Sequence, residues 1–583
     1  MRWTVSSVPA EKVARLAQSA GISPLIAKLL VARGIESAEA ADRFLHPSLS
    51  HLHDPNLMAD MRVAVERLQQ AIARQEKILI YGDYDVDGTM AVVVLLTALG
   101  TLGAKVEAHI PHRLTDGYGM RVSQVERAAS EGFRVVLSVD TGIREHAEIA
   151  RARELGMACI VTDHHLPEAT LPPATAVLNP RRKDCPYPDK NLAGVGVAFK
   201  LAQALLGERL TGRQLESYLK LVAIGTVADV VPLMGENRVI VSFGLRALNQ
   251  PARPGLEALL KVAGLSGRPI TAGDVGFRLA PRLNAAGRME DARDVINLFC
   301  GAHAEDVSQI AERLDHLNRE RQRVEESILN DIMAQTAKDP QKAQRYSLVF
   351  SGEGWHRGVI GIVAQRVVER YHRPTLVVGV EDGKGQGSGR SVPNFHLLQA
   401  LTASRDLFER FGGHAQAAGF TIPVDRLPEL EEQFERQARL RLTPADLEPH
   451  LNVEAELEPN EIGWPFYEQL KLLEPFGVGN STPVFQIRKV RQVSPPRIVG
   501  EKHLKLTVAR DGKSLEVIGW GKAERAEEVK ETQLMDMAFT LGENTYQGVT
   551  SIQLVLRDFR GVESGSESDA KRLEERREGR SSG

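Results

Sequence analysis

Three aspartates alternate along the short segment GDYDVDG, where Asp83, Asp85 and Asp87 follow the apolar run KILIY. Carboxylates this close repel one another unless a cation neutralises them, and their hard oxygens suit magnesium or manganese. The same spacing occurs in the calcium loop of an EF-hand. Here, however, the segment lies between a strand pattern and an apolar helix pattern, and Val94 stands where that loop needs its bidentate Glu. The segment therefore favours a magnesium or manganese site.

Further acidic and imidazole groups follow two later strand patterns. Asp140 ends the run LSVD, and Asp163, His164 and His165 end the run CIVTDHH. Asp229 lies further along, in AIGTVADVVPL. Taken singly, such an aspartate is usually a helix cap and such a histidine is usually structural. Because ligands of open α/β sheets gather at the carboxyl ends of the strands, we expect these groups to converge in one crevice.

A converging set of four or more carboxylates and histidines can hold two divalent ions about 3.5–4 Å apart. Such a pair activates water, orients a phosphate and stabilises the leaving oxygen. The sequence contains no P-loop, dinucleotide fingerprint, nucleophile elbow or H-E-x-x-H motif. These residues therefore predict hydrolysis of a phosphate ester without a covalent intermediate.

The segment GKGQGSGRS also bears on phosphate binding, although it does not match the P-loop pattern. We expect its glycines, within 383–389, to let backbone amides approach a phosphate, with Arg390 as a bidentate donor. A flexible surface loop is the alternative.

The order of the elements predicts several domains in a chain of 583 residues. Strand and helix patterns alternate from Lys77, which is typical of a mainly parallel sheet with helices on both faces. One apolar stripe predicts a long helix over 303–335, which either connects two domains or belongs wholly to the first. The expected parts are an N-terminal helical segment 1–45, a catalytic domain 46–302, a connecting helix 303–340, a second α/β domain 341–445, a small β-barrel 446–562 and a disordered tail 563–583.

The composition constrains the cellular setting. The net charge of −3 does not argue against nucleic acid, because a net value hides local patches and a metal-loaded acidic site alters the local balance. The cysteines Cys159, Cys185 and Cys300 have neither zinc spacing nor the density of a disulfide framework. No signal-peptide pattern and no run of about 18 apolar residues is present. We expect a cytoplasmic protein without a membrane span.

The motifs D-Y-D-x-D-G, D-T-G and D-H-H together resemble the DHH phosphoesterase superfamily. Over the whole chain the resemblance is greatest to the RecJ family, bacterial single-strand-specific exonucleases that act from the 5′ end. It extends from about residue 40 to about residue 560. It includes the segments APRLNAAGRM at 280–289, GWHRGVIGIVAQR at 354–366, GSGRS at 387–391, GGHAQAAGF at 412–420 and LEPFGVGN at 473–480.

The resemblance implies a parallel-sheet DHH domain, a long helix, a DHHA1-type α/β domain and a C-terminal OB-fold β-barrel. It also implies two Mn²⁺ or Mg²⁺ ions. The expected metal ligands are Asp85, Asp87, Asp140, His164 and Asp229. Asp83 and His165 are assigned catalytic roles, Asp83 in support of the ligands and His165 near the scissile phosphate. The expected substrate-binding residues are Arg113, Arg282, Ser388, Arg390 and His414.

For function, the resemblance implies hydrolysis of single-stranded DNA from the 5′ end to mononucleotides, in DNA repair and recombination. It further implies a monomer whose partners are single-strand-binding protein and a RecQ-type helicase. Pyrophosphate, short oligonucleotides or cyclic dinucleotides are alternative substrates. Enzymes of this superfamily that act on such small substrates, however, need only the two α/β domains. The additional barrel favours a polymer, because OB folds bind single strands partly by stacking. Phe485, Trp520, Tyr546 and Phe559 are either stacking or core residues. A non-catalytic scaffold is disfavoured because every expected ligand is present.

Overall fold

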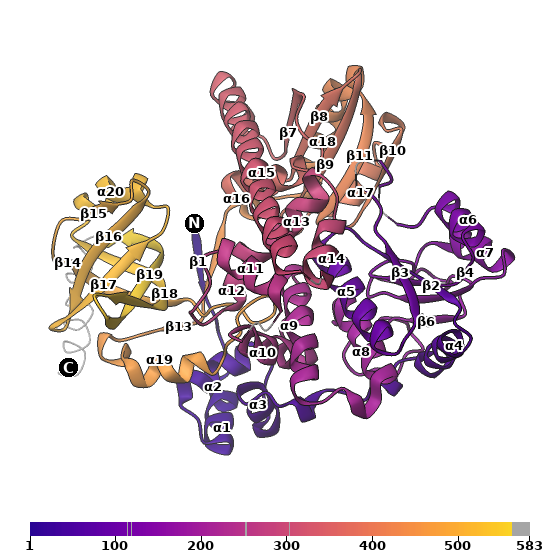
Figure 1. The fold of residues 1–583 in the computed structure, drawn as a ribbon. Helices are drawn as coiled ribbons and strands as arrows, with labels where there is room; N and C mark the ends of the chain where they lie inside the picture. Colours follow the sequence, from indigo (N-terminus) through magenta and orange to yellow (C-terminus); the bar gives the residue numbers. More distant parts are fainter. Residues whose placement is uncertain (114, 118, 251–252, 302, 563–583) are drawn as a thin grey trace, which may run out of the picture. The chain divides into compact units, whose positions relative to one another are not determined.

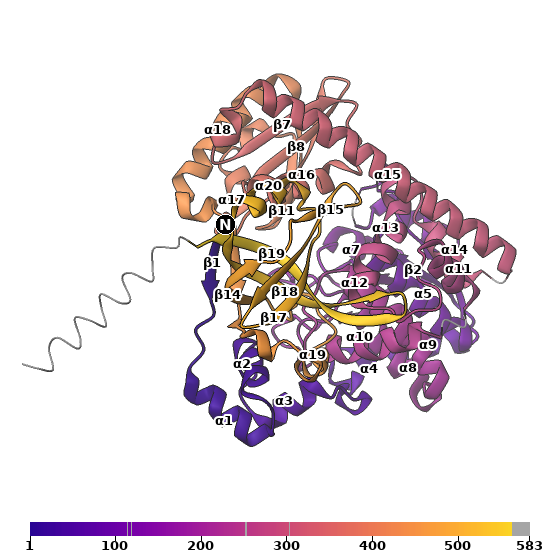
Figure 2. The same cartoon turned by 90° about the vertical axis from the view of Figure 1, so that its left-hand side faces the viewer.

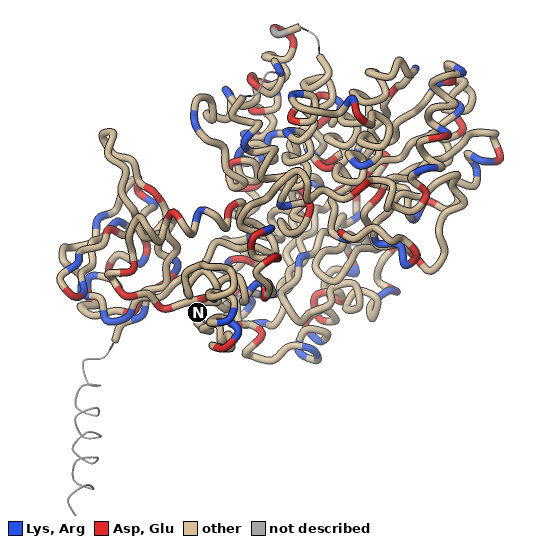
Figure 3. Tube along the Cα trace, turned by 90° about the horizontal axis from the view of Figure 1, so that it is seen from below, with Lys and Arg blue, Asp and Glu red and all other residues tan. Residues whose placement is uncertain are grey.

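The structure, a computed structural model, describes residues 1–562 apart from 114, 118, 251–252 and 302. The predicted disordered tail lies outside the described residues. The chain divides into two units. One comprises Pro47–Pro449 and Pro475–Gly479, and the other comprises Met1–His46, His450–Glu474 and the residues from Asn480 on. Acidic and basic residues alternate along both without a long stretch of one sign (Figure 3).

Five parallel strands form the sheet of the first α/β region, in the order β3-β2-β4-β5-β6 (Figure 1). Apolar residues on both faces of these strands are buried, as a parallel sheet covered by helices requires. The strands are β2 (Lys77–Gly82), β3 (Lys105–His109), β4 (Phe133–Val139), β5 (Ala158–Thr162) and β6 (Ala176–Leu178). One face packs against α4 (Met61–Ala73), α5 (Val86–Thr101) and α8 (Gly194–Leu206), and the other against α6 (Val122–Ser130) and α7 (His146–Glu154). The predicted parallel sheet is confirmed.

A helical region follows this sheet and extends its core. Its elements are α9 (Gly212–Ala228), α10 (Gly235–Leu248), α11 (Pro254–Val262), α12 (Ala272–Asp274), the π-helical turn η4 (Val275–Leu279), α13 (Ala280–Met289) and α14 (Arg293–Cys300). The elements α12, η4 and α13 are continuous in the chain. Pro281 lacks an N–H group, and its ring would clash with the carbonyl group of Phe277 in a regular α-helix. The wider π turn directly before α13 accommodates this proline.

The long helix expected over 303–335 is present as α15 (Ala304–Lys338), a single continuous rod in Figure 2. Its first half contributes Val307, Ala311 and Leu314 to the core of the first α/β region. Its second half contributes Ile328 and Ile332 to the core of the second α/β region. The helix therefore connects the two regions and belongs to both cores.

The second α/β region has a five-stranded sheet in the order β10-β11-β9-β8-β7. The strands are β7 (Leu348–Glu353), β8 (Thr375–Glu381), β9 (Lys384–Arg390), β10 (Arg410–Gly413) and β11 (Ala417–Pro423), and only β7 and β8 are parallel. Helix α16 (Ile360–Tyr371) packs with the second half of α15 on one face. Helices α17 (Leu397–Thr402) and α18 (Leu427–Arg441) pack on the other.

The glycine-rich segment GKGQGSGRS forms β9, so the prediction of a phosphate-binding or flexible loop there was wrong. Strand β9 lies between β8 and β11 and pairs with both, so its backbone amides are engaged in the sheet. The glycines make room for side chains instead, since a Cβ atom on Gly387 would lie 2.0 Å from the ring of Phe420. Any phosphate contact from this strand must therefore come from its side chains.

The other unit contains a seven-stranded sheet in the order β13-β14-β18-β19-β17-β16-β15, and a further pairing of β14 with β16 closes it into a barrel. The side chains of Phe485 and Phe559 are buried in the barrel, whereas those of Trp520 and Tyr546 are exposed. The strands are β13 (Ala455–Glu456), β14 (Phe485–Gln492), β15 (Arg497–Val499), β16 (His503–Arg510), β17 (Lys513–Gly519), β18 (Leu534–Tyr546) and β19 (Val549–Gly561), with α20 (Ala526–Glu531) before β18.

The first 46 residues pack within this unit. Strand β1 (Arg2–Val5) pairs in parallel with β12 (His450–Val453), and a buried ion pair of 2.6 Å joins Arg33 to Glu454. The helices are α1 (Ala10–Ala20), α2 (Pro24–Ala32), α3 (Ala38–Leu45) and α19 (Trp464–Lys471). Among all the helices described, none combines the length and the apolar character that crossing a bilayer requires.

A fully buried ion pair fixes the helices behind the sheet of the first α/β region. Lys200 on α8 lies 2.5 Å from the carboxylate of Glu236 on α10. Glu236 also accepts hydrogen bonds from the Tyr187 hydroxyl group and from the backbone N–H of His53, and Lys200 donates to the carbonyl of His53 at 3.0 Å. Every charge in this network therefore has a partner, which burial demands.

We expect Lys200→Met to lower the free energy of unfolding by about 3–5 kcal/mol, because the substitution leaves the Glu236 carboxylate buried without its cation. Urea unfolding followed by circular dichroism measures the effect. The matched control is Lys261→Met on the exposed side of α11, which should leave the transition unchanged. Equal midpoints for the two variants would contradict the structural role of this pair.

Candidate metal centre

The turn from β2 into α5 positions the three alternating aspartates. Asp83 follows the last residue of β2, Asp85 is the N-cap of α5, and Asp87 lies in the first helical turn. The Asp85 carboxylate accepts a hydrogen bond of 3.0 Å from the backbone N–H of Gly88. Gly88 must be small, because a Cβ atom there would lie 2.7 Å from the Cβ of Asp83.

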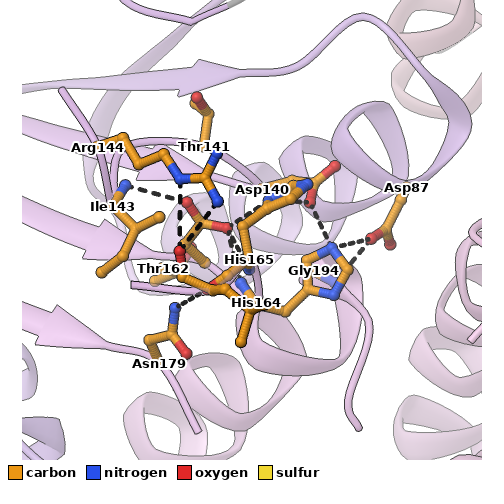
Figure 4. A network of polar contacts seen from close by, with 12 residues as sticks. Asp87, Asp140, Thr141, Ile143, Arg144, Thr162, His164, His165, Asn179 and Gly194 are labelled. Carbon is orange, nitrogen blue, oxygen red and sulfur yellow. Dashed lines mark hydrogen bonds and ion pairs between the residues drawn. The ribbon is translucent and has the colours of Figure 1, made fainter. Parts of the chain in front are cut away.

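The next two strands deliver the remaining groups of the sheet edge. Asp140 follows β4 in the left-handed conformation (φ 58°), which is costly for a residue other than glycine and is concentrated at functional sites. Asp163 follows β5, and its Oδ1 accepts hydrogen bonds from the backbone N–H groups of His164 and His165. The same oxygen lies 2.7 Å from the Nδ1 of His165 (Figure 4). Asp163 therefore fixes the orientation of both histidines that follow it.

The predicted ligands converge around His164, as Figure 4 shows for Asp87 and Asp140. The Nε2 atom of His164 lies 3.2 Å from Asp140, 3.6 Å from Asp229 and 3.9 Å from Asp87. Asp229 is the C-cap of α9, so a helix end and not a strand delivers it. Potential ligand atoms lie within 4.8 Å of one another in three overlapping groups. These groups are Asp83 with Asp85 and Asp140, Asp87 with His164 and Asp229, and Asp140 with His164 and His165.

Burial and mutual repulsion raise the pKa values of the carboxyl groups. Burial is the larger cause throughout; it raises the pKa of Asp87 to about 7 and that of Asp229 to about 10, each with help from neighbouring aspartates. Asp83 and Asp140 are raised well above the ordinary pKa for the same two reasons. Burial also lowers the pKa of His164 to about 3, so its imidazole is neutral at pH 7, as a metal ligand must be.

His165 has the opposite charge preference. Burial alone would lower its pKa, but the hydrogen bond and the charge of Asp163 outweigh burial and raise it. Burial would likewise raise the pKa of Asp163, whereas the bonds from His165 hold it below the ordinary value. The two side chains therefore form an ion pair beside the carboxylate cluster.

The cluster fits a hard divalent ion. The Oδ1 of Asp83, the Nε2 of His164 and the Oδ2 of Asp229 are buried and have no hydrogen-bond partner within the described residues. Buried polar atoms are normally satisfied, so several such atoms in one place indicate that a ligand is part of the site. Carboxylate oxygens with one imidazole are donors that Mn²⁺ and Mg²⁺ accept.

The N-terminus of α8 supports the cluster, although its residues were not among the predicted site residues. The Asp87 carboxylate accepts hydrogen bonds from the backbone N–H groups of Gly194 (2.7 Å) and Val195 (2.9 Å), where the helix dipole favours an anion. A Cβ atom on Gly194 would lie 2.5 Å from the Oδ1 of Asp140. The glycines of GVG at 194–196 were the available signal in the sequence.

Three arginines gather beside the acidic cluster. The guanidinium of Arg113 stacks on the ring of Tyr84 at 4.0 Å, and Arg390 contacts the Oγ of Ser388 at 3.3 Å. Burial lowers the pKa of Arg288 to about 9, and the charges of Arg113 and Arg390 contribute to the lowering. Such mutual repulsion of buried cations favours binding of an anion. Arg288 was missed by the sequence analysis, although it lies within the segment APRLNAAGRM.

The structure gives Arg282 a different environment. It lies on α13 and forms an ion pair of 2.9 Å with the buried Asp315 of α15. Arg319 pairs with the same carboxylate. Among the contacts of the described residues, those of Arg282 hold the two helices together and do not join it to the other three arginines.

His414, between β10 and β11, lines a cavity of about 260 Å³ together with Asp163 of the first α/β region. His165 lines the same cavity, and burial and the charges of Arg144 and His165 lower the pKa of His414. The second α/β region thus supplies one wall of the site. Arg144, which donates to the Leu166 carbonyl at 3.2 Å, is a further cation here that sequence reasoning missed.

Comparison with known proteins agrees with this geometry. Family models match at residues 77–226 (DHH family, N-terminal domain), 344–439 (DHHA1 domain) and 453–558 (RecJ OB domain). The single-stranded-DNA-specific exonuclease RecJ of Bacillus subtilis is 37% identical over 561 residues, which cover 96% of this chain and 70% of the relative. The RecJ of Escherichia coli is 34% identical over a stretch that covers 92% of this chain and 96% of the relative. The chain belongs to the RecJ family.

Solved RecJ structures of Thermus thermophilus have the same fold. The complex with Mn²⁺ is 31% identical with a TM-score of 0.82, and covers 97% of this chain and 80% of that one. The complex with Mg²⁺ is 30% identical with a TM-score of 0.77, covering 97% and 79%. The predicted succession of DHH domain, long helix, DHHA1-type domain and OB barrel is confirmed. The Thermus thermophilus relative thus binds Mn²⁺ and Mg²⁺, the two kinds of ion that the sequence predicts here.

We expect the stabilisation by Mn²⁺ to increase with pH. A carboxyl group with a raised pKa carries a proton that the ion must displace, so binding releases protons and strengthens as pH rises through the Asp87 value of about 7. Without metal, the stability of the folded chain changes with pH in the opposite direction. The folded chain holds these protons more tightly than the unfolded chain, so its stability falls as pH rises from the ordinary aspartate value towards about 7.

Melting temperatures measured with and without Mn²⁺, on either side of this pKa, test both signs. The control is Asp306→Ala, an exposed position in α15, which should reproduce the parent profile. A melting-temperature shift that does not depend on pH would show that the raised carboxyl pKa values are not linked to metal binding.

Proposed function

We propose that this RecJ-family chain is a metal-dependent exonuclease that hydrolyses single-stranded DNA from the 5′ end to mononucleotides. The convergence of a buried carboxylate–histidine cluster with a half-buried arginine cluster carries the proposal, because cleavage at the end of a strand needs metal ligands at the scissile bond and cations that bind the phosphates. The RecJ relatives of Bacillus subtilis and Escherichia coli are single-stranded-DNA-specific exonucleases by name. Their identity over nearly the whole chain supports the same substrate.

Two ions account for the ligand geometry. Asp83, Asp85 and Asp140 form one group of potential ligands, and Asp87, His164 and Asp229 form another. His164 lies 3.2 Å from Asp140, so the two groups adjoin. When bound, a pair of such ions supplies an activated water and neutralises charge on the phosphate.

The residues around these ligands orient and stabilise the substrate. Asp163 holds the His165 ring in place and raises its pKa, which favours the protonated ring; a fixed cation there would stabilise the charge that develops on the scissile phosphate. His414 approaches the same cavity from the second α/β region and is a further candidate for contact with the phosphate. Asp83 supports the ligand set from the end of β2.

Polarity requires a pocket that recognises one end of the strand. A terminal phosphate carries more charge than an internal one and accepts bidentate bonds from arginine. Arg113, Arg288 and Arg390, whose charges act on one another, are the candidates for such a pocket, with Ser388 as an additional hydroxyl donor. We assign this cluster to the 5′-terminal phosphate.

The OB barrel favours a polymeric substrate over a dinucleotide or pyrophosphate, since OB folds bind single strands. Trp520 and Tyr546 are exposed on it and remain candidates for stacking, whereas Phe485 and Phe559 are core residues. A role in DNA repair and recombination, action as a monomer, a cytoplasmic location, and contacts with single-strand-binding protein and a RecQ-type helicase stay predictions from the resemblance.

We expect Asp87→Ala and Asp140→Ala to reduce turnover by several orders of magnitude, because each removes a buried ligand and its negative charge. Binding of single strands should persist, since most of it comes from phosphate contacts elsewhere. Release of nucleotides from end-labelled single- and double-stranded DNA, with each metal in turn, measures the first effect, and fluorescence anisotropy measures the second. Near-normal cleavage by either variant in manganese would remove the metal assignment.

We expect Arg390→Ala to weaken the preference for a 5′-phosphate over a 5′-hydroxyl group, while Mn²⁺ still raises the melting temperature. The ratio of kcat/KM for the two ends measures the preference. Arg439→Ala, on the exposed side of α18 and paired with Glu435, is the matched control and should keep the parent ratio. A parent enzyme without any preference, or an unchanged ratio in Arg390→Ala, would show that the arginine cluster does not recognise the end.

A further inference from the structure

Phe277 is the most exposed large apolar side chain among the described residues, with 85% of its surface accessible. It lies in the π-helical turn η4, where the neighbouring Val275 and Leu279 are fully buried. The turn is therefore anchored by its other face, and Phe277 has no packing role in the fold. A single exposed apolar residue is common, but π turns are rare and often lie at functional sites.

A second exposed apolar residue directly follows the predicted ligand Asp229. Val230 is 65% exposed and has a left-handed backbone conformation (φ 63°). This conformation is a genuine outlier for a β-branched residue and carries a cost in stability. A strained backbone that presents a valine to water beside a metal ligand is better explained by a binding role than by folding.

The two residues flank the same helix end. Gly276, next to Phe277, packs against the last turn of α9, since a Cβ atom on it would lie 3.7 Å from the Cγ1 of Val227. Asp229 caps that turn and Val230 follows it. Two exposed apolar residues therefore lie near the end of α9 that carries the predicted ligand Asp229.

We propose that Phe277 and Val230 form a contact for one unpaired base of the substrate strand next to the metal centre. The inference rests on the proposed exonuclease function and adds a base contact to it. Two side chains match the face of one base, whereas a protein partner needs an interface of about 1,000 Å² or more. An exposed aromatic ring is a recurrent platform for single strands, and it stacks on every base alike.

The first test compares Phe277→Ala with the parent full-length chain on an oligonucleotide in Mn²⁺. Loss of one stacked base should raise KM by about 5-fold to 100-fold. Phe277→Trp should retain the parent KM, and all melting temperatures should agree because the side chain is exposed. Leu440→Ala on α18, with a side chain 69% exposed, is the matched control and should change neither constant.

The second test locates the base. A single abasic site is placed at successive positions of the oligonucleotide, and KM is measured for the parent and for Phe277→Ala. At one position, near the scissile phosphate, the abasic site and the substitution should each raise KM, but their combination should raise it no further. Effects that multiply at every position, or an unchanged KM in Phe277→Ala, would overturn the base contact.

The outcomes distinguish the two proposals. If the parent chain neither binds nor cleaves single strands in Mn²⁺ or Mg²⁺, the proposed function itself fails. If the parent cleaves normally and Phe277→Ala is identical to it, only the base contact fails. Val230→Gly provides a second variant: it should raise KM while relieving backbone strain, so its melting temperature should not fall.

Discussion

Repulsion among buried carboxylates is the constraint around which the metal centre is organised. Asp83, Asp87, Asp140 and Asp229 repel one another's charged forms, and burial strengthens the effect. The fold keeps these groups largely away from water, which would otherwise screen their charges. It places helix N–H donors on Asp87, a neutral imidazole among the oxygens, and several unsatisfied ligand atoms toward one centre. A divalent cation is the remaining component that balances such a charge.

The adjoining arginines present the same situation with the opposite sign. The charges of Arg113 and Arg390 help to lower the pKa of Arg288, and the charge of Arg113 helps to lower that of Arg390, so these cations repel one another. A phosphodiester chain brings anionic groups at regular intervals, and a terminal phosphate brings the greatest charge. On the proposed function, excess negative charge at the ligands would select an ion, and excess positive charge at the arginines would select a phosphate.

The parallel sheet and most of the ligand set were predictable because they depend on local patterns. Apolar runs define the strands, and the carboxyl ends of parallel strands must share one edge, so Asp87, Asp140 and His164 had to converge. Strand β9 was not predictable, because seven residues of which three are glycine read as a loop, and only the facing ring of Phe420 explains them. Arg288 and the exposed Phe277 were not predicted, for a related reason. Whether an arginine or a phenylalanine is paired, buried or presented to solvent depends on contacts between distant segments.

The number of residues in helix α15 sets the rotation of one α/β region relative to the other, and so the geometry of the site. Both α/β regions build their cores on this one helix, Leu314 serving the first and Ile328 the second. A helix turns by about 100° for each residue, so inserting a single residue between these two positions would rotate one core about the axis of the other. Arg390 and His414 would then swing away from the aspartates while every local contact within each region stayed intact. The length of this segment, counted in residues, is therefore as much a part of the active site as any side chain in it.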